Sequence, residues 1–279
     1  MENRKSVSIL GCGWLGLELA KSLIAEGWKV KASTTSVEKI SQLEDCGIEA
    51  YLVQFNANNK PDLNKFLDSD VLIISIPPGR NNPDGQNSYQ NMLEILTSLL
   101  PESKIAKVIL VSSTSVYGDV NKEVTEADLP QPDTDSGKLL LNAEQQFLAL
   151  NNIKVVIVRP SGLVGNDRFP GKFFTGKTNI PNGLSPVNMI HKTDISGIIK
   201  KLVNDENADG IYNACSPNHP VKKDFYALAA KKINLNPPGF LDEKVKWKTV
   251  KSDRVKQELN YDFVYPDLME WLKSYQISN

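Results

Sequence analysis

Short apolar runs alternate with helically spaced apolar positions over the first two-thirds of the chain. Residues 7–10 form the first run, and Leu15, Leu19 and Leu23 then follow at the spacing of one helix face. The alternation continues, with strands expected at 28–33, 49–55, 71–76, 107–112, 155–159 and 211–213 and helices at 37–46, 88–100, 137–150 and 193–203. This order predicts an α/β fold of the Rossmann type, a doubly wound parallel sheet with helices on both faces.

The pattern loosens after Gly165. Residues 166–186 are rich in glycine, proline and asparagine, and this segment is too long for a simple connector. Two or three short helices are expected towards the C-terminus. We therefore predict a Rossmann domain at 1–165, completed by about 191–213, and a small, mostly helical cap formed by 166–190 and 214–279.

A GxGxxG pattern lies between the first expected strand and the first expected helix. It consists of Gly11, Cys12, Gly13, Trp14, Leu15 and Gly16. Gly11 permits the tight turn, Gly13 lets the backbone approach a pyrophosphate, and Gly16 lets the helix pack closely on the strand. A chance run of glycines is the alternative, but the strand-turn-helix context favours a dinucleotide-binding site.

The end of the second strand bears on which dinucleotide is bound. An NAD-binding unit usually has Asp or Glu there to hold the ribose hydroxyls. Here these positions are hydroxyl residues, namely Ser33, Thr34, Thr35 and Ser36. The first acid, Glu38, is expected inside the next helix, whereas Lys31 and Lys39 would tolerate a 2′-phosphate. We predict NADP as the cofactor and leave NAD open, because the arginine often used for that phosphate is missing; Ser36 can also cap the helix.

Composition narrows the chemistry further. The 279 residues carry 32 Lys+Arg against 33 Asp+Glu, so the positive excess typical of nucleic-acid binding is absent. The 2 His and 3 unclustered Cys argue against a metal site and for a reducing compartment. The longest apolar run is far shorter than the ~20 residues of a membrane helix. We predict a cytoplasmic protein that binds no metal, nucleic acid or membrane, and whose chemistry a bound cofactor carries.

A second motif follows the strand expected at 107–112. An SSxxVYG pattern is matched by Ser112, Ser113, Val116, Tyr117 and Gly118. Here the chain resembles the extended short-chain dehydrogenase/reductase family, which includes NAD(P)-dependent nucleotide-sugar epimerases and dehydratases. Residues 159–165, 188–195 and 211–213 resemble later motifs of that family and follow in the same order. The resemblance implies an NAD(P) cofactor and a hydrogen bond from Ser113 to the reacting oxygen; a cap on the strand end is the alternative for Ser113.

One departure from that family concerns proton transfer. The family uses a Tyr and a Lys four residues later on one helix face. Aligning Glu144 with the family's usual Glu puts Ser136 at the Tyr position and Leu140 at the Lys position, so the comparison implies that this pair is missing. Tyr117 is the phenol of the SSxxVYG motif, and it is either the proton donor or a wall of the substrate pocket.

Further candidate contacts lie at strand ends and in loops. Towards the cofactor they are Ile76, Pro77, Arg80 and Ser112. Towards the substrate they are Ser136, Arg168, Lys172 and His191. Each of the last set has a structural alternative, which is helix capping for Ser136, solvated charge for the two cations and a packing role for His191.

The sequence thus predicts an NAD(P)-dependent oxidoreductase or epimerase-like protein acting on a small polar substrate, with a nucleotide sugar as the candidate. The alternative is a non-catalytic NADP(H)-binding sensor or regulatory protein, which the missing Tyr-Lys pair favours. The retained Ser113 and the substrate-side motifs favour the enzyme.

Overall fold

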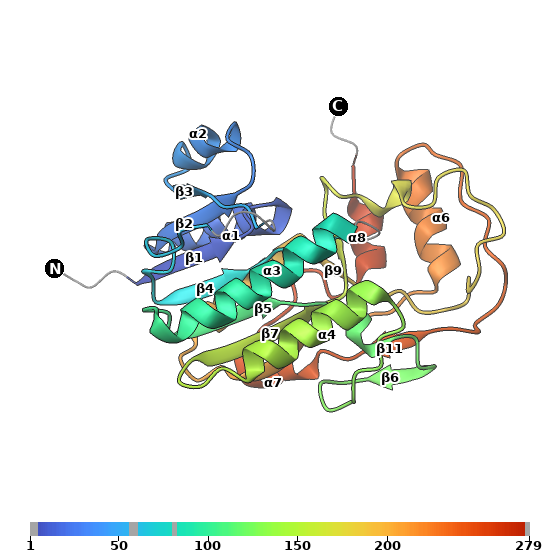
Figure 1. Ribbon diagram of the computed structural model, residues 1–279. Coiled ribbons are helices and arrows are strands. Elements are labelled where there is room, and N and C mark those ends of the chain that lie inside the picture. The colour runs from blue at the N-terminus through green and yellow to red at the C-terminus, as the bar shows by residue number, and fades with distance from the viewer. Residues whose placement is uncertain (1–4, 56–60, 80–82, 277–279) are drawn as a thin grey trace. The chain divides into compact units, whose positions relative to one another are not determined.

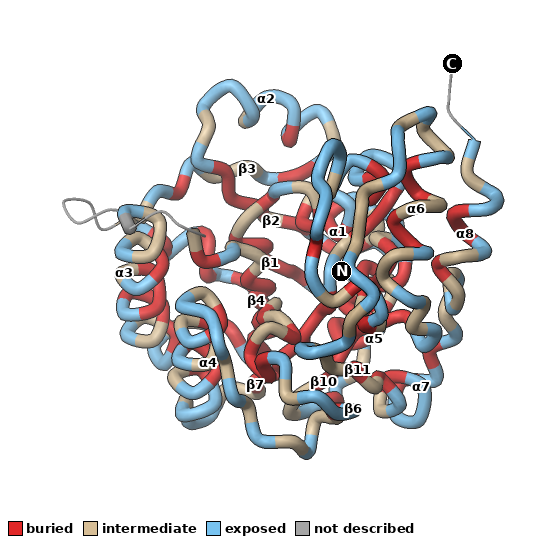
Figure 2. The backbone as a smooth tube through the Cα atoms, turned by 90° about the vertical axis from the view of Figure 1, so that its right-hand side faces the viewer, coloured by how far each residue is buried: buried red, intermediate tan, exposed pale blue. Residues whose placement is uncertain are grey.

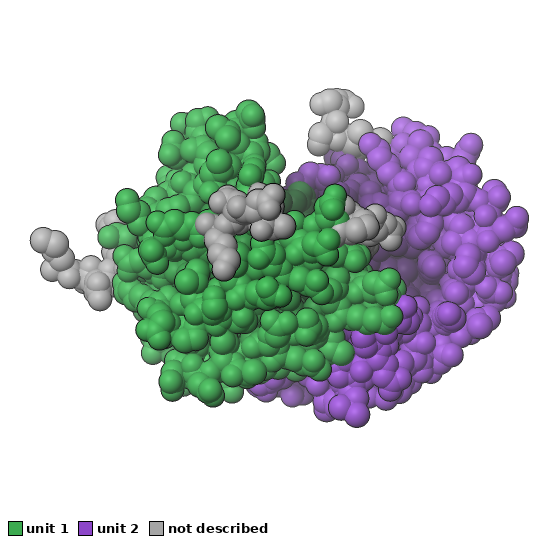
Figure 3. Space-filling view, viewed as in Figure 1, with its two compact units in different colours: residues 1–113, 134–158, 199–211 green, residues 114–133, 159–198, 212–279 purple. Residues whose placement is uncertain are grey.

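The computed structural model describes residues 5–55, 61–79 and 83–276. The chain divides into two compact units (Figure 3). Unit 1 comprises 1–113, 134–158 and 199–211, and unit 2 comprises 114–133, 159–198 and 212–279. The chain enters each unit three times, so neither unit is one continuous stretch of sequence. The domain boundaries expected from the sequence remain a prediction.

A seven-stranded sheet has the order β10-β7-β5-β4-β1-β2-β3, in which Figure 1 labels every strand except β10. Its strands are β1 (Ser6–Leu10), β2 (Lys29–Thr34), β3 (Glu49–Leu52), β4 (Val71–Ile74), β5 (Lys107–Val111), β7 (Lys154–Pro160) and β10 (Gly210–Ala214). β1 pairs in parallel with β2 and β4, and β5 pairs in parallel with β4 and β7. The chain runs outward from β1 to β3 and then returns to β4 on the other side of β1, which is the order of a doubly wound sheet. The predicted Rossmann-type α/β fold is confirmed.

The helices of unit 1 follow its strands. They are α1 (Trp14–Ala25), α2 (Lys39–Glu44), α3 (Pro83–Leu99), α4 (Asp135–Leu148) and the end of α5 (Lys192–Asn204). Leu15, Leu19 and Leu23 of α1 are all buried, as their spacing predicts. α3 and α4 lie side by side (Figure 1).

The centre of the sheet is buried on both faces. Every residue of β1 and β4 is buried (Figure 2), which explains the uninterrupted apolar run of β4. Ser8 is a polar residue within β1, and its hydroxyl donates to the carbonyl of Phe66 and lies 2.7 Å from the hydroxyl of Ser69. The buried hydroxyl therefore keeps its hydrogen bonds.

Unit 2 is built from short elements. They are β6 (Lys122–Val124), β8 (Gly162–Val164), β9 (Met189–His191), β11 (Lys248–Val250), α6 (Lys222–Lys232), α7 (Asp253–Leu259) and α8 (Leu268–Ser274). β6 pairs in parallel with β11, and β8 with β9. Sequence periodicity misses these strands because three residues are too few to show an alternation. In the part of the chain that the structure describes, no helix combines the length and apolar character needed to span a membrane.

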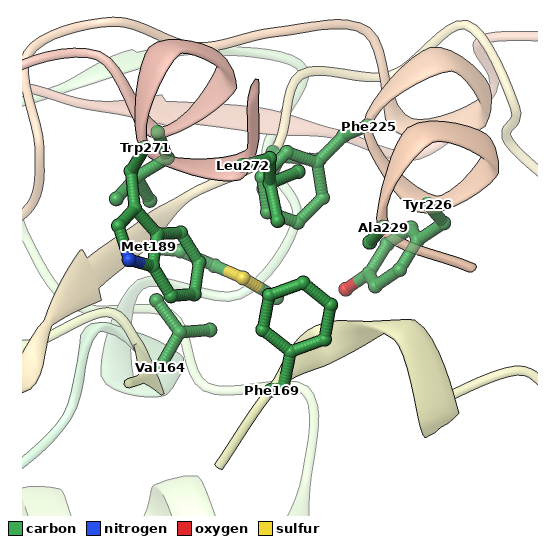
Figure 4. Close-up of a cluster of buried hydrophobic side chains, with 10 residues drawn as sticks. Val164, Phe169, Met189, Phe225, Tyr226, Ala229, Trp271 and Leu272 are labelled. Atoms are coloured by element: carbon green, nitrogen blue, oxygen red, sulfur yellow. The ribbon is translucent and has the colours of Figure 1, made fainter. Parts of the chain in front are cut away.

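An aromatic core holds α6 and α8 in unit 2 (Figure 4). The ring of Phe169 lies 5.5 Å from that of Trp271 and stacks on Tyr275 at 4.0 Å, measured between ring centroids. Phe225 of α6 and Leu272 of α8 are fully buried in the same cluster. Large aromatic side chains remove much apolar area from water per residue, so a few of them stabilise a unit that has little regular structure.

A buried carboxylate organises the segment before α8. Asp194, in the first turn of α5, accepts hydrogen bonds from the Tyr261 hydroxyl at 3.0 Å and from the backbone N–H groups of Val264 at 2.7 Å and Tyr265 at 3.0 Å. Burial raises the pKa of Asp194, and the three donors oppose that rise. Since three donors converge on one carboxylate, Asp194 fixes the path of residues 261–265.

Candidate functional site

The glycine turn between β1 and α1 requires glycine at its first position. Gly11 has φ +98°, and an added Cβ would lie 2.8 Å from Cγ1 of Ile76 and 2.9 Å from the carbonyl oxygen of Ser75. The N–H of Gly11 donates to Oγ of Ser33 at 2.9 Å, and the N–H of Cys12 donates to the carbonyl of Ser33 at 2.8 Å. Ser33 therefore ties the turn to the end of β2.

The other two glycines differ in what surrounds them. A Cβ on Gly16 would lie 2.3 Å from the carbonyl oxygen of Gly11, so the start of α1 packs directly on the turn. Within the described part of the chain, a Cβ on Gly13 would meet nothing within 4 Å, and Gly13 makes no side-chain cap of α1. The N-terminus of α1 is thus open towards an incoming anion. The residues present fit the pyrophosphate of a dinucleotide.

The non-glycine residues of the turn have their side chains mostly covered. Cys12 and Leu15 are buried and Trp14 is half-buried. The pKa of the Cys12 thiol is raised to about 11, because burial and the neighbouring Cys46 raise it and the ammonium of Lys39 only partly opposes them. A ligand at this turn would therefore meet backbone rather than a reactive thiolate.

The hydroxyl residues at the end of β2 mostly bind the protein itself. Oγ1 of Thr34 accepts from the N–H of Ser36 at 3.2 Å, and the carbonyl of Thr35 accepts from Nε2 of Gln54 at 2.9 Å. The Ser36 hydroxyl donates to Glu38 and lowers the pKa of that carboxyl. The expectation that Glu38 lies inside the next helix is wrong, because α2 begins at Lys39 and Glu38 is its N-cap residue.

The two lysines considered for a 2′-phosphate have different surroundings. Nζ of Lys31 donates to the carbonyls of Lys65 and, at 2.9 Å, of Asp68. It is therefore engaged in holding the segment before β4. Lys39 is exposed, and its charge reaches the thiol of Cys12 in the glycine turn. Lys39 is consequently the better placed of the two cations.

The strand ends of β4 and β5 supply further predicted contacts. Ile76 is half-buried beside Gly11, and Pro77 is exposed. Arg80 lies outside the described residues. The Ser112 hydroxyl donates to the carboxylate of Glu144, which is 1% exposed, so Ser112 ties the end of β5 to α4.

Two further predicted site residues are Ser113, just after β5, and Ser136, near the start of α4. Ser113, half-buried, directly follows Ser112. Oγ1 of Thr134 accepts from the N–H of Gly137 at 3.1 Å, which makes Thr134 the N-cap of α4. The alternative that Ser136 caps this helix is therefore wrong. Ser136 lies in the first turn and is half-buried, and Leu140 is in the core.

Tyr117 belongs to a buried polar network in unit 2. Its hydroxyl donates to Oδ1 of Asn213 at 2.9 Å and accepts from Nη1 of Arg159 at 2.8 Å, and Tyr117 is 1% exposed. Burial raises the pKa of Tyr117, and the guanidinium of Arg159 opposes the rise. The N–H of Asn213 in turn donates to Glu126 at 2.8 Å. The phenol is thus engaged both as donor and as acceptor.

The predicted substrate residues of unit 2 lie in two different surroundings. Arg168 and Lys172 are exposed in the loop that follows β8. His191 is buried between the rings of Tyr265 and Trp271, with centroids 4.1 Å and 5.1 Å away, and its Nδ1 accepts from the N–H of Thr193. Burial lowers the pKa of His191 to about 4, so this imidazole is neutral at pH 7.

Unit 2 contains a pocket of about 200 Å³ that the sequence did not indicate. It is lined by Asp119, Asn182, Ser185, Pro186, Val187, Asn188, Met189, Lys222, Tyr226, Lys246, Trp247 and Lys248. Nζ of Lys248 pairs with Asp119 at 2.9 Å. Three lysines against one carboxylate make the lining positive. Among the described residues, no three His, Cys, Asp or Glu side chains are grouped to hold a metal ion.

Asparagines build the wall of this pocket. Oδ1 of Asn182, at φ +63°, accepts from the N–H groups of Val245 and Lys246. The side chain of Asn188 donates to the carbonyl of Lys248 at 2.8 Å and accepts from the N–H of Val250 at 2.8 Å. Asn188 thus fastens its loop to β11, and Asn182 fastens the same loop to the segment just before β11.

A family model and a relative of similar length match this chain. Residues 11–206 match a family model described as NAD(P)H-binding. "Protein YeeZ" from Escherichia coli strain K12 is 37% identical over 268 residues, which cover 94% of this chain and 97% of that protein. The chain belongs to the NAD(P)H-binding family.

Solved structures show that this NAD(P)H-binding protein shares its fold with epimerases. UDP-glucuronic acid 4-epimerase from Bacillus cereus, in complex with NAD, superposes with a TM-score of 0.76 at 18% identity and 96% coverage of each chain. Human epimerase family protein SDR39U1, with NADPH, has a TM-score of 0.70 at 17% identity, covering 96% of this chain and 98% of that one.

Sequence reasoning missed the pocket of the NAD(P)H-binding protein because its lining comes from four separate segments. One signal was available, since Lys246 and Lys248 flank Trp247, but only Lys248 lies in a strand, because β11 begins there. Lys222 gave no such signal, because a lysine at a helix start is ordinarily a solvated charge.

Proposed function

We propose that the protein is an NAD(P)-dependent oxidoreductase or epimerase-like enzyme acting on a small anionic substrate. The observation that carries the proposal is the glycine turn, whose open position at Gly13 faces the uncapped N-terminus of α1. A nicotinamide cofactor bound there would supply hydride transfer. The chain itself then has to bind the cofactor, orient the substrate and stabilise the charge that develops on the reacting oxygen.

We favour NADP over NAD as the cofactor. Support comes from Lys39, whose ammonium is exposed close to the glycine turn, and from the hydroxyl residues at the end of β2. The carboxylate of Glu38, held by Ser36, would favour the ribose hydroxyls of NAD instead. The two epimerase-fold structures described above were solved with NAD and with NADPH, so they support either cofactor.

Ser113 is the proposed anchor of the reacting oxygen. Its hydroxyl would donate to a carbonyl or alkoxide oxygen, which stabilises negative charge as it develops. The hydrogen bond from Ser112 to Glu144 would position Ser113 by fixing the end of β5. The Tyr117 hydroxyl is engaged by Arg159 and Asn213, so we assign Tyr117 a positioning role and take the proton from water or from the substrate.

The pocket of unit 2 is the proposed substrate-binding site. Its positive lining suits a phosphate or carboxylate, and a nucleotide sugar provides the first of these. The Bacillus cereus epimerase takes its name from UDP-glucuronic acid, a molecule of this class. Exposed Arg168 and Lys172 remain candidate contacts for the same anion, and Ser136 and His191 remain candidates from the sequence alone.

Turnover and binding together test this proposal. We expect NADPH oxidation with at least one member of a panel of nucleotide sugars, aldehydes and ketones, and a loss of about 100-fold in rate for Ser113→Ala with unchanged NADPH affinity. Ser115→Ala is the matched control and should keep full activity. Unchanged turnover in Ser113→Ala would remove Ser113 from the mechanism.

A second candidate function is a non-catalytic NADP(H) sensor. It is favoured by the resemblance drawn from the sequence, which would put Ser136 and the buried Leu140 at the positions of the Tyr-Lys pair. Tight NADPH binding without oxidation by any compound of the panel would favour the sensor. Measurable turnover that depends on Ser113 would exclude it.

A further inference from the structure

Lys222 has an unusual place in the pocket of unit 2. It is the first residue of α6, and its side chain lines the pocket together with Tyr226, one helical turn later. The charged groups that line the pocket with it are Asp119, Lys246 and Lys248. The only carboxylate among them, Asp119, is paired with Lys248 at 2.9 Å, and the Lys248 side chain is 14% exposed.

Aromatic rings displace water from the Lys222 ammonium. Its Nζ lies 5.6 Å from the ring centroid of Phe174 and 5.7 Å from that of Phe240, and these two rings pack edge to face at 5.5 Å. Both Nζ distances are near the outer limit of about 6 Å for a cation–π contact, so the rings hold the charge weakly. Burial lowers the pKa of Lys222, while Asp119 opposes the change.

The next residue provides a contrast on the same helical turn. Nζ of Lys223 donates to Asp242 at 2.7 Å in a solvent-exposed ion pair, and this hydrogen bond raises the pKa of Lys223. Two adjacent lysines therefore have opposite tendencies to lose a proton. A lysine whose ammonium is desolvated has a larger fraction of neutral amine, and this makes it more nucleophilic near neutral pH.

We propose that Lys222 is a nucleophilic amine and that the pocket captures carbonyl compounds carrying an anionic group as an imine on its Nζ. Lys246 and Lys248 would attract the anionic group. The lone pair of the neutral amine attacks the carbonyl carbon to give a carbinolamine, which loses one molecule of water and leaves a C=N bond to Nζ. The reaction needs no oxidant or reductant and is reversible.

Reductive trapping tests the proposal on the full chain. The protein is treated with pyridoxal 5′-phosphate, an aldehyde with a phosphate, and with cyanoborohydride, which delivers hydride to the C=N bond and gives a stable secondary amine. Peptide mass spectrometry then compares the labelling of neighbouring lysines. We expect Lys222 to be labelled about tenfold faster than Lys223 at pH 7.5, the ratio that a tenfold larger fraction of free amine gives. Equal labelling, or faster labelling of Lys223, would overturn the proposal.

Two variants sharpen the test. Lys223→Arg should leave the labelling of Lys222 unchanged. Asp119→Asn removes the carboxylate that favours the ammonium form and frees the charge of Lys248, so Lys222 should be labelled faster at pH 7 in that variant. Slower or unchanged labelling in Asp119→Asn, with thermal unfolding unaffected, would contradict the assigned geometry.

This inference rests on the proposed function only in taking the same pocket as the substrate site. NADPH binding without labelling of Lys222 would overturn the inference and leave the proposed function standing. Selective labelling without any NADPH or NADH binding would do the reverse.

Discussion

The candidate site of unit 1 consists mainly of backbone groups, and that of unit 2 consists mainly of side chains. In unit 1 the glycine turn offers backbone, since Gly11 and Gly16 are tightly packed and Gly13 is open. In unit 2 the pocket offers side chains, with lysines for charge and amides for its wall. The backbone site leaves no room for a Cβ at Gly11 or Gly16, whereas the side-chain site depends on the positions of a few buried polar anchors.

This difference predicts which substitutions should impair each unit. The strands of unit 1 are held by a parallel ladder over a continuous apolar core. Unit 2 has three-residue strands, and Asp194 and Asn188 supply hydrogen bonds that regular structure supplies elsewhere. Substitutions of polar anchors should therefore unfold unit 2, and substitutions of glycine should disable unit 1.

The largest effect is expected at Asp194. Asp194→Ala leaves one hydroxyl and two backbone N–H donors without their acceptor, so the free energy of unfolding should fall by about 3 kcal/mol. Urea denaturation measures this fall. Asp167→Ala is the control, since its half-exposed ion pair with Lys192 should contribute less than about 1 kcal/mol. Equal losses in the two variants would remove Asp194 from its organising role.

Gly13→Ala tests the backbone site of unit 1. The added Cβ meets open space in the protein, so thermal unfolding should change little, but it would occupy the place of the pyrophosphate. We expect NADPH affinity to fall about 100-fold by calorimetry, a loss of roughly 2.7 kcal/mol. Gly16→Ala should instead destabilise the fold, because its Cβ would lie 2.3 Å from a carbonyl oxygen. Full NADPH affinity in Gly13→Ala would contradict the site.

The pH dependence of stability concerns His191 in unit 2. The pKa of this imidazole is about 4 in the folded protein and near 6.5 when unfolded, so the unfolded state binds the extra proton first. Stability from His191 is therefore complete above pH 6.5 and is lost as pH falls towards 4. Between pH 7 and 4.5 the free energy of unfolding should drop by roughly 2 kcal/mol more in the wild type than in His191→Phe. Parallel pH profiles of the two proteins would contradict this account.

The smallest effect is expected for cofactor preference. Lys39→Glu should lower the ratio of NADPH to NADH affinity about tenfold, because a carboxylate replaces a cation whose charge reaches Cys12 in the turn. Lys31→Met is the control, and should leave the ratio unchanged because Lys31 is bound to the carbonyls of Lys65 and Asp68. A shift caused by Lys31 instead would reverse the assignment of the two lysines.

The sequence predicted unit 1 better than unit 2 for a physical reason. A strand, GxGxxG and a helix are neighbours in the chain, so their spacing contains the geometry of the turn. The apolar run of β4 likewise indicated its burial. By contrast, Asp119, Lys222 and Lys248 meet only after folding, and no local pattern links them. The sequence pattern also did not predict the exact first residues of helices. Thr134 rather than Ser136 caps α4, and Glu38 precedes α2.

Calorimetric titration of the full chain with NADPH and with NADH tests the central claim most directly. We predict one site per chain, tighter for NADPH, with a dissociation constant below about 100 µM, and a loss of that binding in Gly13→Ala. Absence of binding by either dinucleotide at about 1 mM would contradict the assignment of the glycine turn as the cofactor site.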